Sequence, residues 1–179
     1  KVISDSIEKL NNLVANVLKL NKLENQKIVP EVSTFELADF FGQTLLAFEH
    51  IWEEKNILID VDFEENLFVK TDKNFLEIVC NNLISNALKF TENGGKVFVS
   101  CFKENGFASI CIQDTGCGIS KETGKHIFEK FYQGDTSHKE KGNGLGLALV
   151  KRIIDVLGAE ISINSELGKG STFIIKIKL

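Results

Sequence analysis

A carboxylate followed by two closely spaced glycines is the feature that most constrains this chain. Residues Gln113 to Gly118 read Gln-Asp-Thr-Gly-Cys-Gly and follow a strand-like run from Gly106 to Ile112. A buried Asp114 at the end of a strand can accept hydrogen bonds from the amine of a flat heterocycle and from a bridging water. Gly116 and Gly118 carry no side chain that would keep the backbone from such a ring. The same residues are also typical of a tight turn, so the motif alone leaves both interpretations open.

Composition narrows the class of protein. The chain has 179 residues, of which 43% are hydrophobic, enough for one domain and an appendage. A net charge of -4 and a pI near 5.5 do not favour nucleic acid or an anionic membrane as a partner. The four cysteines have no Cys-x-x-Cys spacing and form no Cys/His cluster for zinc. We therefore expect reduced, mostly buried cysteines in a cytoplasmic protein.

The chain has no stretch of the length of a membrane span and does not open with a signal-peptide pattern. It begins at Lys1 and contains no methionine. We expect a fragment of a longer protein, whose full-length form could reach the inner or plasma membrane only through other parts.

Residues 1 to about 26 are predicted to form one long helix. Apolar side chains recur at alternating spacings of four and three, at Ile3, Ile7, Leu10, Val14 and Val17. This pattern favours partner helices in a bundle or coiled-coil dimer, and the alternative is a helix packed on its own domain. Residues 26–32, with the single Pro30, are predicted to be a linker.

A second helix is predicted from Thr34 to Glu54, capped by Ser33 or Thr34. Residues 57–63 alternate like a strand, and residues 67–69 are predicted to be its short partner strand.

The helix predicted from Asp72 to about Thr91 carries an unusual polar stripe. Asn82, Asn86 and Lys89 recur at i, i+4 and i+7, on one face. Asparagine is a mediocre helix former, so two of them one turn apart require a reason. One reason is surface exposure or a buried amide network. The other is a Mg²⁺ site in which an amide oxygen holds the cation and the lysine contacts a phosphate.

The last part of the chain predicts a hairpin, a short helix, a loop, a long helix and two more strands. The hairpin strands are residues 96–103 and 106–113, and Ser120 caps the short helix. Residues 134–141 are polar and predicted to be a mobile loop. The glycine-rich run Gly142 to Leu147 then opens an apolar helix, an arrangement that suits phosphate. No βαβ unit follows these glycines and the P-loop lysine is absent, which disfavours both of those nucleotide motifs. The final strands are predicted at residues 159–164 and 172–179.

Five motifs occur in an order that resembles the catalytic domain of sensor histidine kinases, within the Bergerat-fold (GHKL) ATPase superfamily. They resemble the N box, the first glycine box, the F box and the second and third glycine boxes, at residues 82–91, 114–119, 127–132, 142–147 and 168–173. The resemblance implies an α+β fold: a two-layer α/β sandwich with a mixed, mostly antiparallel sheet, helices on one face, and one long helix in front. It also implies two units. Residues 1–27 resemble the second helix of the dimerisation and phosphoacceptor hairpin, and residues 28–179 the catalytic ATP-binding domain.

The resemblance assigns roles to individual residues. Asp114 is expected to accept from the adenine amine, with Phe90 lying against the base. Asn86 is expected to bind Mg²⁺, with Asn82 nearby on metal or phosphate. Lys89 and Lys130 are the expected catalytic, phosphate-facing lysines. The remaining expected ATP-binding residues shape the adenine end, line apolar walls or present backbone amides to phosphates: Gly116, Gly118, Ile119, Phe131, Gly142, Gly144, Leu145, Gly146, Leu147 and Thr172. Residues 134–141 are the expected ATP lid.

One local departure from the family concerns charge. Lys130 and Gln133 stand where the family often has arginines, and lysine lacks the bidentate fork of arginine.

The implied activity is transfer of the γ-phosphoryl group of Mg-ATP to a histidine. The expected partners are the phosphoacceptor helix of the same or a partner subunit, a response regulator receiver domain, and a second copy in a full-length homodimer. His50, His126 and His138 lack the sequence context of the family's acceptor histidine, so we expect the acceptor to lie outside this fragment.

Two alternatives remain at this point. One is an ATP-hydrolysing clamp or serine kinase, which in the superfamily carries a glutamate where this chain has Asn82. The other is a nucleotide-binding regulator without turnover.

Overall fold

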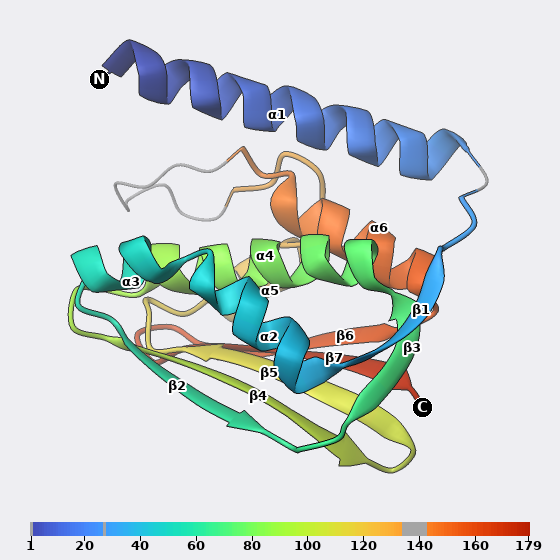
Figure 1. Ribbon diagram of the computed structural model, residues 1–179. Coiled ribbons are helices and arrows are strands. Elements are labelled where there is room, and N and C mark those ends of the chain that lie inside the picture. The colour runs from blue at the N-terminus through green and yellow to red at the C-terminus, as the bar shows by residue number, and fades with distance from the viewer. Residues whose placement is uncertain (1, 27, 134–142) are drawn as a thin grey trace.

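The computed structural model describes residues 2–26, 28–133 and 143–179, and its centre is a five-stranded sheet (Figure 1). The strand order is β2-β4-β5-β7-β6. The strands are β2 (Leu58–Phe63), β4 (Lys96–Glu104), β5 (Phe107–Asp114), β6 (Glu160–Glu166) and β7 (Gly170–Lys178). Only β2 and β4 pair in parallel, and the other neighbours are antiparallel. The predicted mixed, mostly antiparallel sheet is therefore confirmed.

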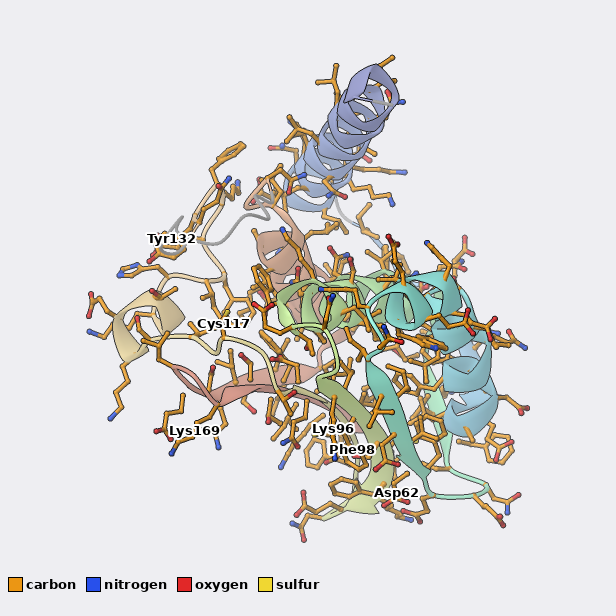
Figure 2. The ribbon with its side chains drawn as sticks, turned by 90° about the vertical axis from the view of Figure 1, so that its left-hand side faces the viewer. Asp62, Lys96, Phe98, Cys117, Tyr132 and Lys169 are labelled. Carbon is orange, nitrogen blue, oxygen red and sulfur yellow. The ribbon has the colours of Figure 1, made fainter. Side chains whose placement is uncertain are left out.

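Helices cover one face of this sheet, as predicted (Figure 1). They are α2 (Leu37–Leu46), α3 (Glu49–Glu54), α4 (Lys73–Phe90), α5 (Lys121–Gly124) and α6 (Gly146–Leu157). Alternate residues of β4, β5 and β7 point at the helices and are buried, including Val99, Ile110 and Ile175. The other face carries Lys96, Phe98 and Asp62, and none of the helices in the described part of the chain lies over it (Figure 2).

Local signals fixed the ends of several elements. In α4, the side chain of Asp72 accepts a hydrogen bond from the N–H of Phe75, which caps the helix. In the β4–β5 hairpin, Asn105 and Gly106 both have positive φ, as the tight turn requires. Gly158 ends α6 in the left-handed conformation.

The predicted helix from Thr34 to Glu54 is wrong in its first part and in its continuity. Residues Val32–Glu36 form β1, which pairs antiparallel with β3 (Phe68–Asp72) in a separate two-stranded sheet. Valine, threonine and phenylalanine suit a strand, and the pairing with a segment 36 residues away outweighs the capping potential of Ser33 and Thr34. The helix begins only at Leu37, and the chain turns again at Ala47 and Phe48 before α3.

The predicted partner of residues 67–69 is also wrong. Since β3 pairs with β1, the strand β2 takes β4 as its neighbour. Sequence alternation identified both strands but carries no information on which strand lies beside which.

The long helix α1 (Val2–Asn25) lies above α6, on the far side of the helical layer from the sheet (Figure 1). Near its C-terminal end, Leu20 and Leu23 are buried. The predicted seam residues Ile7, Leu10, Val14 and Val17 are each at least 40% exposed. One stripe therefore packs on the domain while the seam remains uncovered. In the described part of the chain, neither α1 nor any other helix combines the length and the apolar character needed to cross a membrane.

Candidate nucleotide site

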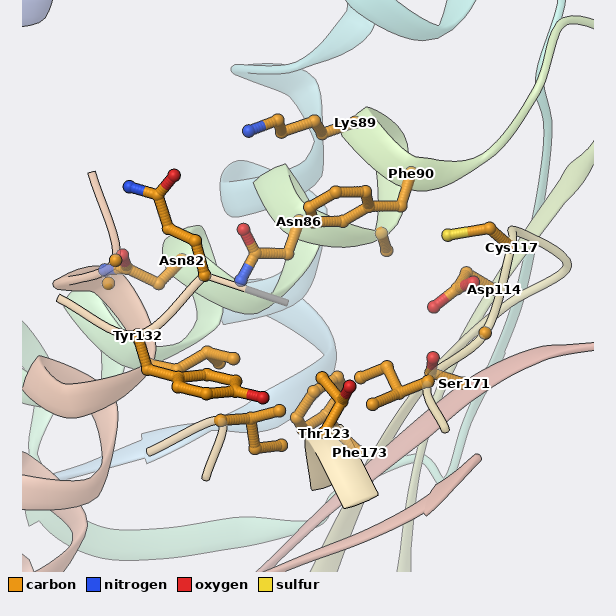
Figure 3. Close-up of a pocket in the computed structure, with 18 of the residues that line it drawn as sticks. Asn82, Asn86, Lys89, Phe90, Asp114, Cys117, Thr123, Tyr132, Ser171 and Phe173 are labelled. Carbon is orange, nitrogen blue, oxygen red and sulfur yellow. The ribbon is translucent and has the colours of Figure 1, made fainter. Parts of the chain in front are cut away.

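A cavity of about 440 Å³ opens between α4, α6, the segment after β5, and the start of β7 (Figure 3). Asn82, Asn86 and Phe90 follow one another along α4 on one wall of the cavity. Asp114 and Cys117 lie at one end, and Tyr132 lies toward the other, near α6. The cavity thus brings together residues from near both ends of the sequence, from Asn16 to Phe173.

Asp114 is the last residue of β5 and is only 6% exposed. One carboxylate oxygen accepts a hydrogen bond of 2.8 Å from the N–H of Gly116. Burial raises the pKa of this carboxyl above 3.8, and hydrogen bonds from the N–H groups of Gly116 and Ser171 partly oppose that rise. A buried acceptor at the closed end of a cavity can recognise a donor on a ligand.

The glycines after Asp114 let the chain pass close to its neighbours. A Cβ on Gly116 would lie 2.4 Å from the carbonyl oxygen of Phe90. A Cβ on Gly118, where φ is +66°, would lie 2.0 Å from the carbonyl oxygen of Glu166. Both positions therefore exclude any side chain, which explains why glycine occupies them.

The polar stripe of α4 faces the cavity, as predicted. Asn82, Asn86 and Lys89 all line it, together with Phe90. The amide nitrogen of Asn82 donates to the carbonyl oxygen of Ile78 at 2.7 Å. The ammonium of Lys89 lies 5.0 Å from the centre of the Phe90 ring. The stripe therefore presents amides and one cation to a ligand.

The N-terminus of α6 forms the end of the cavity opposite Asp114. Gly144, Gly146 and Leu147 line it, and the side chain of Asn143 accepts from the N–H of Leu145 at 3.2 Å. The first N–H groups of a helix have no partner within the helix and favour anions. Gly142 and the expected lid, residues 134–141, lie outside the described residues.

Several expected site residues do not line the cavity. Phe131 is 64% exposed, and Lys130 is paired with Glu24 of α1 at 2.7 Å. Leu145 is buried in the core, and Gly116 acts through its close packing and its N–H group. Thr172 does not line the cavity, whereas its neighbour Ser171 does, because successive residues of β7 point to opposite faces of the sheet.

The cavity is also lined by residues that were not among the expected site residues, although some lie in the named motifs: Asn16, Ala87, Cys117, Ser120, Thr123, Ile127, Tyr132, Gln133, Asn143, Leu167, Ser171 and Phe173. Ser171 pairs directly with Asp114 across β5 and β7, a contact between distant strands that the local sequence does not reveal. Nothing in the local sequence indicates that Asn16, from α1, reaches the same cavity.

The donor set allows a hard cation only with help from a ligand. Among the described residues, no three histidine, cysteine or acidic side chains cluster as a metal site would require. The side chains in the cavity that could offer a neutral amide oxygen to a cation include Asn86 and Asn82, which lie on the α4 wall. Mg²⁺ commonly binds in this way, with phosphate oxygens and water completing its coordination.

Comparison with known proteins agrees with this geometry. Residues 71–179 match the family described as histidine kinase-, DNA gyrase B-, and HSP90-like ATPase. The chain is 36% identical over 182 residues to the circadian input-output histidine kinase CikA of Synechococcus elongatus, covering 99% of this chain and 24% of CikA.

Solved structures give the same result for the fold. Full-length ShkA in complex with AMPPNP superposes with a TM-score of 0.87 at 28% identity, over 97% of this chain and 36% of ShkA. The Acinetobacter baumannii histidine kinase AdeS superposes with a TM-score of 0.84 at 28% identity, over 99% of this chain and 82% of the AdeS chain. The cavity, its flanking motifs and these similarities lead to one conclusion: this chain belongs to the family of histidine kinase-, DNA gyrase B- and HSP90-like ATPases.

Proposed function

We propose that this chain is the ATP-binding catalytic part of a two-component sensor histidine kinase. It transfers the γ-phosphoryl group of Mg-ATP to a histidine on a phosphoacceptor helix of the same or a partner subunit. The phosphoryl group then passes to an aspartate of a response regulator receiver domain. Because the chain spans only 24% of CikA, the activity of the whole protein is part of this proposal.

The observation that carries the proposal is the buried carboxylate of Asp114 at one end of a cavity whose other end is a helix N-terminus. An adenine amine can donate to Asp114, and the base then lies beside Phe90. The phosphates extend toward the backbone N–H groups of Gly144, Gly146 and Leu147. The complex of ShkA with AMPPNP supports nucleotide binding by the same fold.

A Mg²⁺ ion fits between the adenine end and the phosphate end of the cavity. Asn86 would hold the cation, with Asn82 next to it, and the remaining ligands would be phosphate oxygens and water. Bound there, the cation would neutralise phosphate charge. Lys89 lines the same stretch of the cavity and adds positive charge. The role that the sequence assigned to Lys130 requires it to leave Glu24, since the two form an ion pair of 2.7 Å.

The residue at position 82 favours phosphoryl transfer over hydrolysis. A clamp ATPase or a serine kinase of the superfamily needs a general base near the metal. The amide of Asn82 cannot take a proton, and its nitrogen is bonded to the carbonyl oxygen of Ile78. The chain's own residues therefore bind, orient and neutralise ATP, and an imidazole from the acceptor helix serves as the nucleophile.

We further propose that residues 1–27 belong to the dimerisation hairpin and residues 28–179 to the catalytic domain. The uncovered apolar seam of α1 supports this division, since Leu10 and Val14 are 59% and 50% exposed. In the full-length protein a second helix and a second subunit would cover that seam. His50 is exposed on α3 and His126 contacts Glu129 at 2.7 Å, and neither has the acceptor context.

The proposal is tested with ATP labelled in the γ position and a separately produced phosphoacceptor domain. The expected result is label on that domain that is lost in acid and stable in base. Asp114→Ala should abolish labelling while the far-UV circular dichroism spectrum is unchanged. Release of labelled phosphate at the rate of a dedicated ATPase, without protein labelling, would contradict the proposal.

A further inference from the structure

We propose that α1 is part of the nucleotide site, and that the Asn16 carboxamide donates a hydrogen bond to the terminal phosphates of the bound nucleoside triphosphate. This inference rests on the proposed function, because it takes the α6 end of the cavity as the phosphate end. It adds a contact from outside the catalytic domain and couples nucleotide binding to the docking of α1.

The first observation is that α1 is held against the domain at a defined register. The side chain of Arg152 on α6 donates two hydrogen bonds to the carbonyl oxygen of Leu23, at 3.0 and 2.6 Å. Lys130 pairs with Glu24 at 2.7 Å. Leu20 and Leu23 are buried beneath these contacts. The C-terminal end of α1 is thus fixed by packing, by hydrogen bonds and by charge.

The second observation is where this register places Asn16. Asn16 precedes Leu23 by seven residues, and Gly146 precedes Arg152 by six. At ~1.5 Å per helical residue, these separations are roughly 10 Å and 9 Å. The two helices run side by side in the same direction (Figure 1), so similar separations from the Arg152–Leu23 contact bring Asn16 toward the N-terminus of α6. Asn16 accordingly lines the cavity together with Asn143, Gly144 and Gly146.

The third observation is the kind of residue at this position. Leu13, Asn16, Leu20 and Leu23 recur at spacings of three, four and three, so they share the face of α1 that packs on the domain. An apolar residue would continue this face, and asparagine is a poorer helix former than leucine. The Asn16 side chain is half-buried and makes no hydrogen bond to any residue in the described part of the chain. A polar side chain in an apolar stripe, aimed at a cavity, is explained by a polar ligand.

The neighbourhood favours an anion as that ligand. The positive end of the α6 dipole and its first N–H groups attract phosphate oxygens. The carboxamide of Asn16 adds a neutral donor to the wall of the same cavity. Bound nucleotide therefore favours the docking of α1 on the domain, and docking of α1 raises the affinity for nucleotide by the same factor.

The test compares affinities for ATP and for adenosine by calorimetry in the presence of Mg²⁺. Asn16→Asp removes the donor and adds a negative charge beside the phosphates, so ATP affinity should fall about tenfold or more while adenosine affinity is unchanged. Asn21→Asp is the matched control on the same helix, at an exposed position, and should change neither affinity. Asn16→Ala favours the helix and should weaken ATP binding by about threefold, so the loss cannot come from unfolding of α1.

Arg152→Ala tests the coupling. It should weaken ATP binding, and Asn16→Asp should have a smaller further effect in that background than in the wild type. Equal ATP affinities for Asn16→Asp and Asn21→Asp would overturn the inference, as would tighter ATP binding by Asn16→Asp, which would indicate a metal ligand. If the wild-type chain binds neither ATP nor adenosine, it is the proposed function that fails.

Discussion

At the scale of single residues, Asp114 combines two opposing requirements. Its carboxyl group accepts most strongly from a ligand amine when it is ionised, yet it is buried at the end of β5. Burial raises its pKa above 3.8 despite the N–H groups of Gly116 and Ser171. Binding sites often keep an ionisable group in a buried environment that disfavours its charged form, and the protein then gives up some stability for function.

This conflict predicts a specific pH dependence of stability. An acid whose pKa is higher in the folded state than in the unfolded chain stabilises the fold when protonated, and that contribution is lost as pH rises through the folded pKa. As pH falls from neutrality toward 3.8, the wild type should therefore gain stability relative to Asp114→Asn, which does not titrate. Denaturant unfolding of both proteins across this range measures the difference. A difference that is constant with pH would show that Asp114 has an ordinary pKa.

At the scale of secondary-structure elements, α4 carries the polar wall of the cavity and its start is fixed by Asp72. This buried carboxylate accepts from the N–H of Phe75 at 3.0 Å and from the N–H of Glu31 at 2.7 Å. It therefore caps α4 and also holds the chain where it enters β1. The orientation of Asn82 and Asn86 depends on a helix that begins at this place.

Removing the Asp72 side chain that caps α4 should destabilise the fold. Asp72→Ala leaves two N–H groups without their acceptor and should lower the free energy of unfolding by about 2 kcal/mol. Asp60→Ala, at an exposed position on β2, should stay within about 0.5 kcal/mol of the wild type. Chemical denaturation of the three proteins provides the comparison. Equal losses for the two variants would mean that Asp72 is not a structural cap.

The elements also separate what the sequence can predict from what it cannot. The helix bearing Asn82 and Asn86, the hairpin leading to Asp114 and the helix after Gly144 follow from local signals: periodicity, a cap and tight turns. The strand β1 was missed because its pairing with β3 is a contact between distant segments. Thr172 was predicted where Ser171 lies, because a one-residue error along a strand exchanges the two faces of the sheet. Asn16 could not be predicted, since only the docking of α1 brings it to the cavity.

At the scale of the whole molecule, the nucleotide site lies at a junction. The sheet and helices α4 and α6 form its walls, while α1 closes one side through Asn16 and through contacts at Leu23 and Glu24. The opposite, uncovered face of α1 exposes Leu10 and Val14. The helix α1 thus has one face at the cavity and another that is suited to packing against other helices. A change in how α1 packs against such helices can therefore alter nucleotide binding.

Ligand binding at such a site should stabilise the entire chain. At a Mg-ATP concentration 100 times the dissociation constant, the free energy of unfolding should rise by about 2.7 kcal/mol. Asp114→Ala should show no rise at the same ligand concentration. Thermal unfolding with and without Mg-ATP provides the measurement. Equal stabilisation of both proteins would mean that ATP binds elsewhere.

The most direct test of this account is a crystal structure of the chain with Mg²⁺ and a non-hydrolysable ATP analogue. We predict the adenine amine within hydrogen-bond distance of the Asp114 carboxylate, the metal on Asn86, and the terminal phosphates between Asn16 and the first N–H groups of α6. A nucleotide bound outside the cavity, or one with its base at the α6 end and its phosphates at Asp114, would contradict the account.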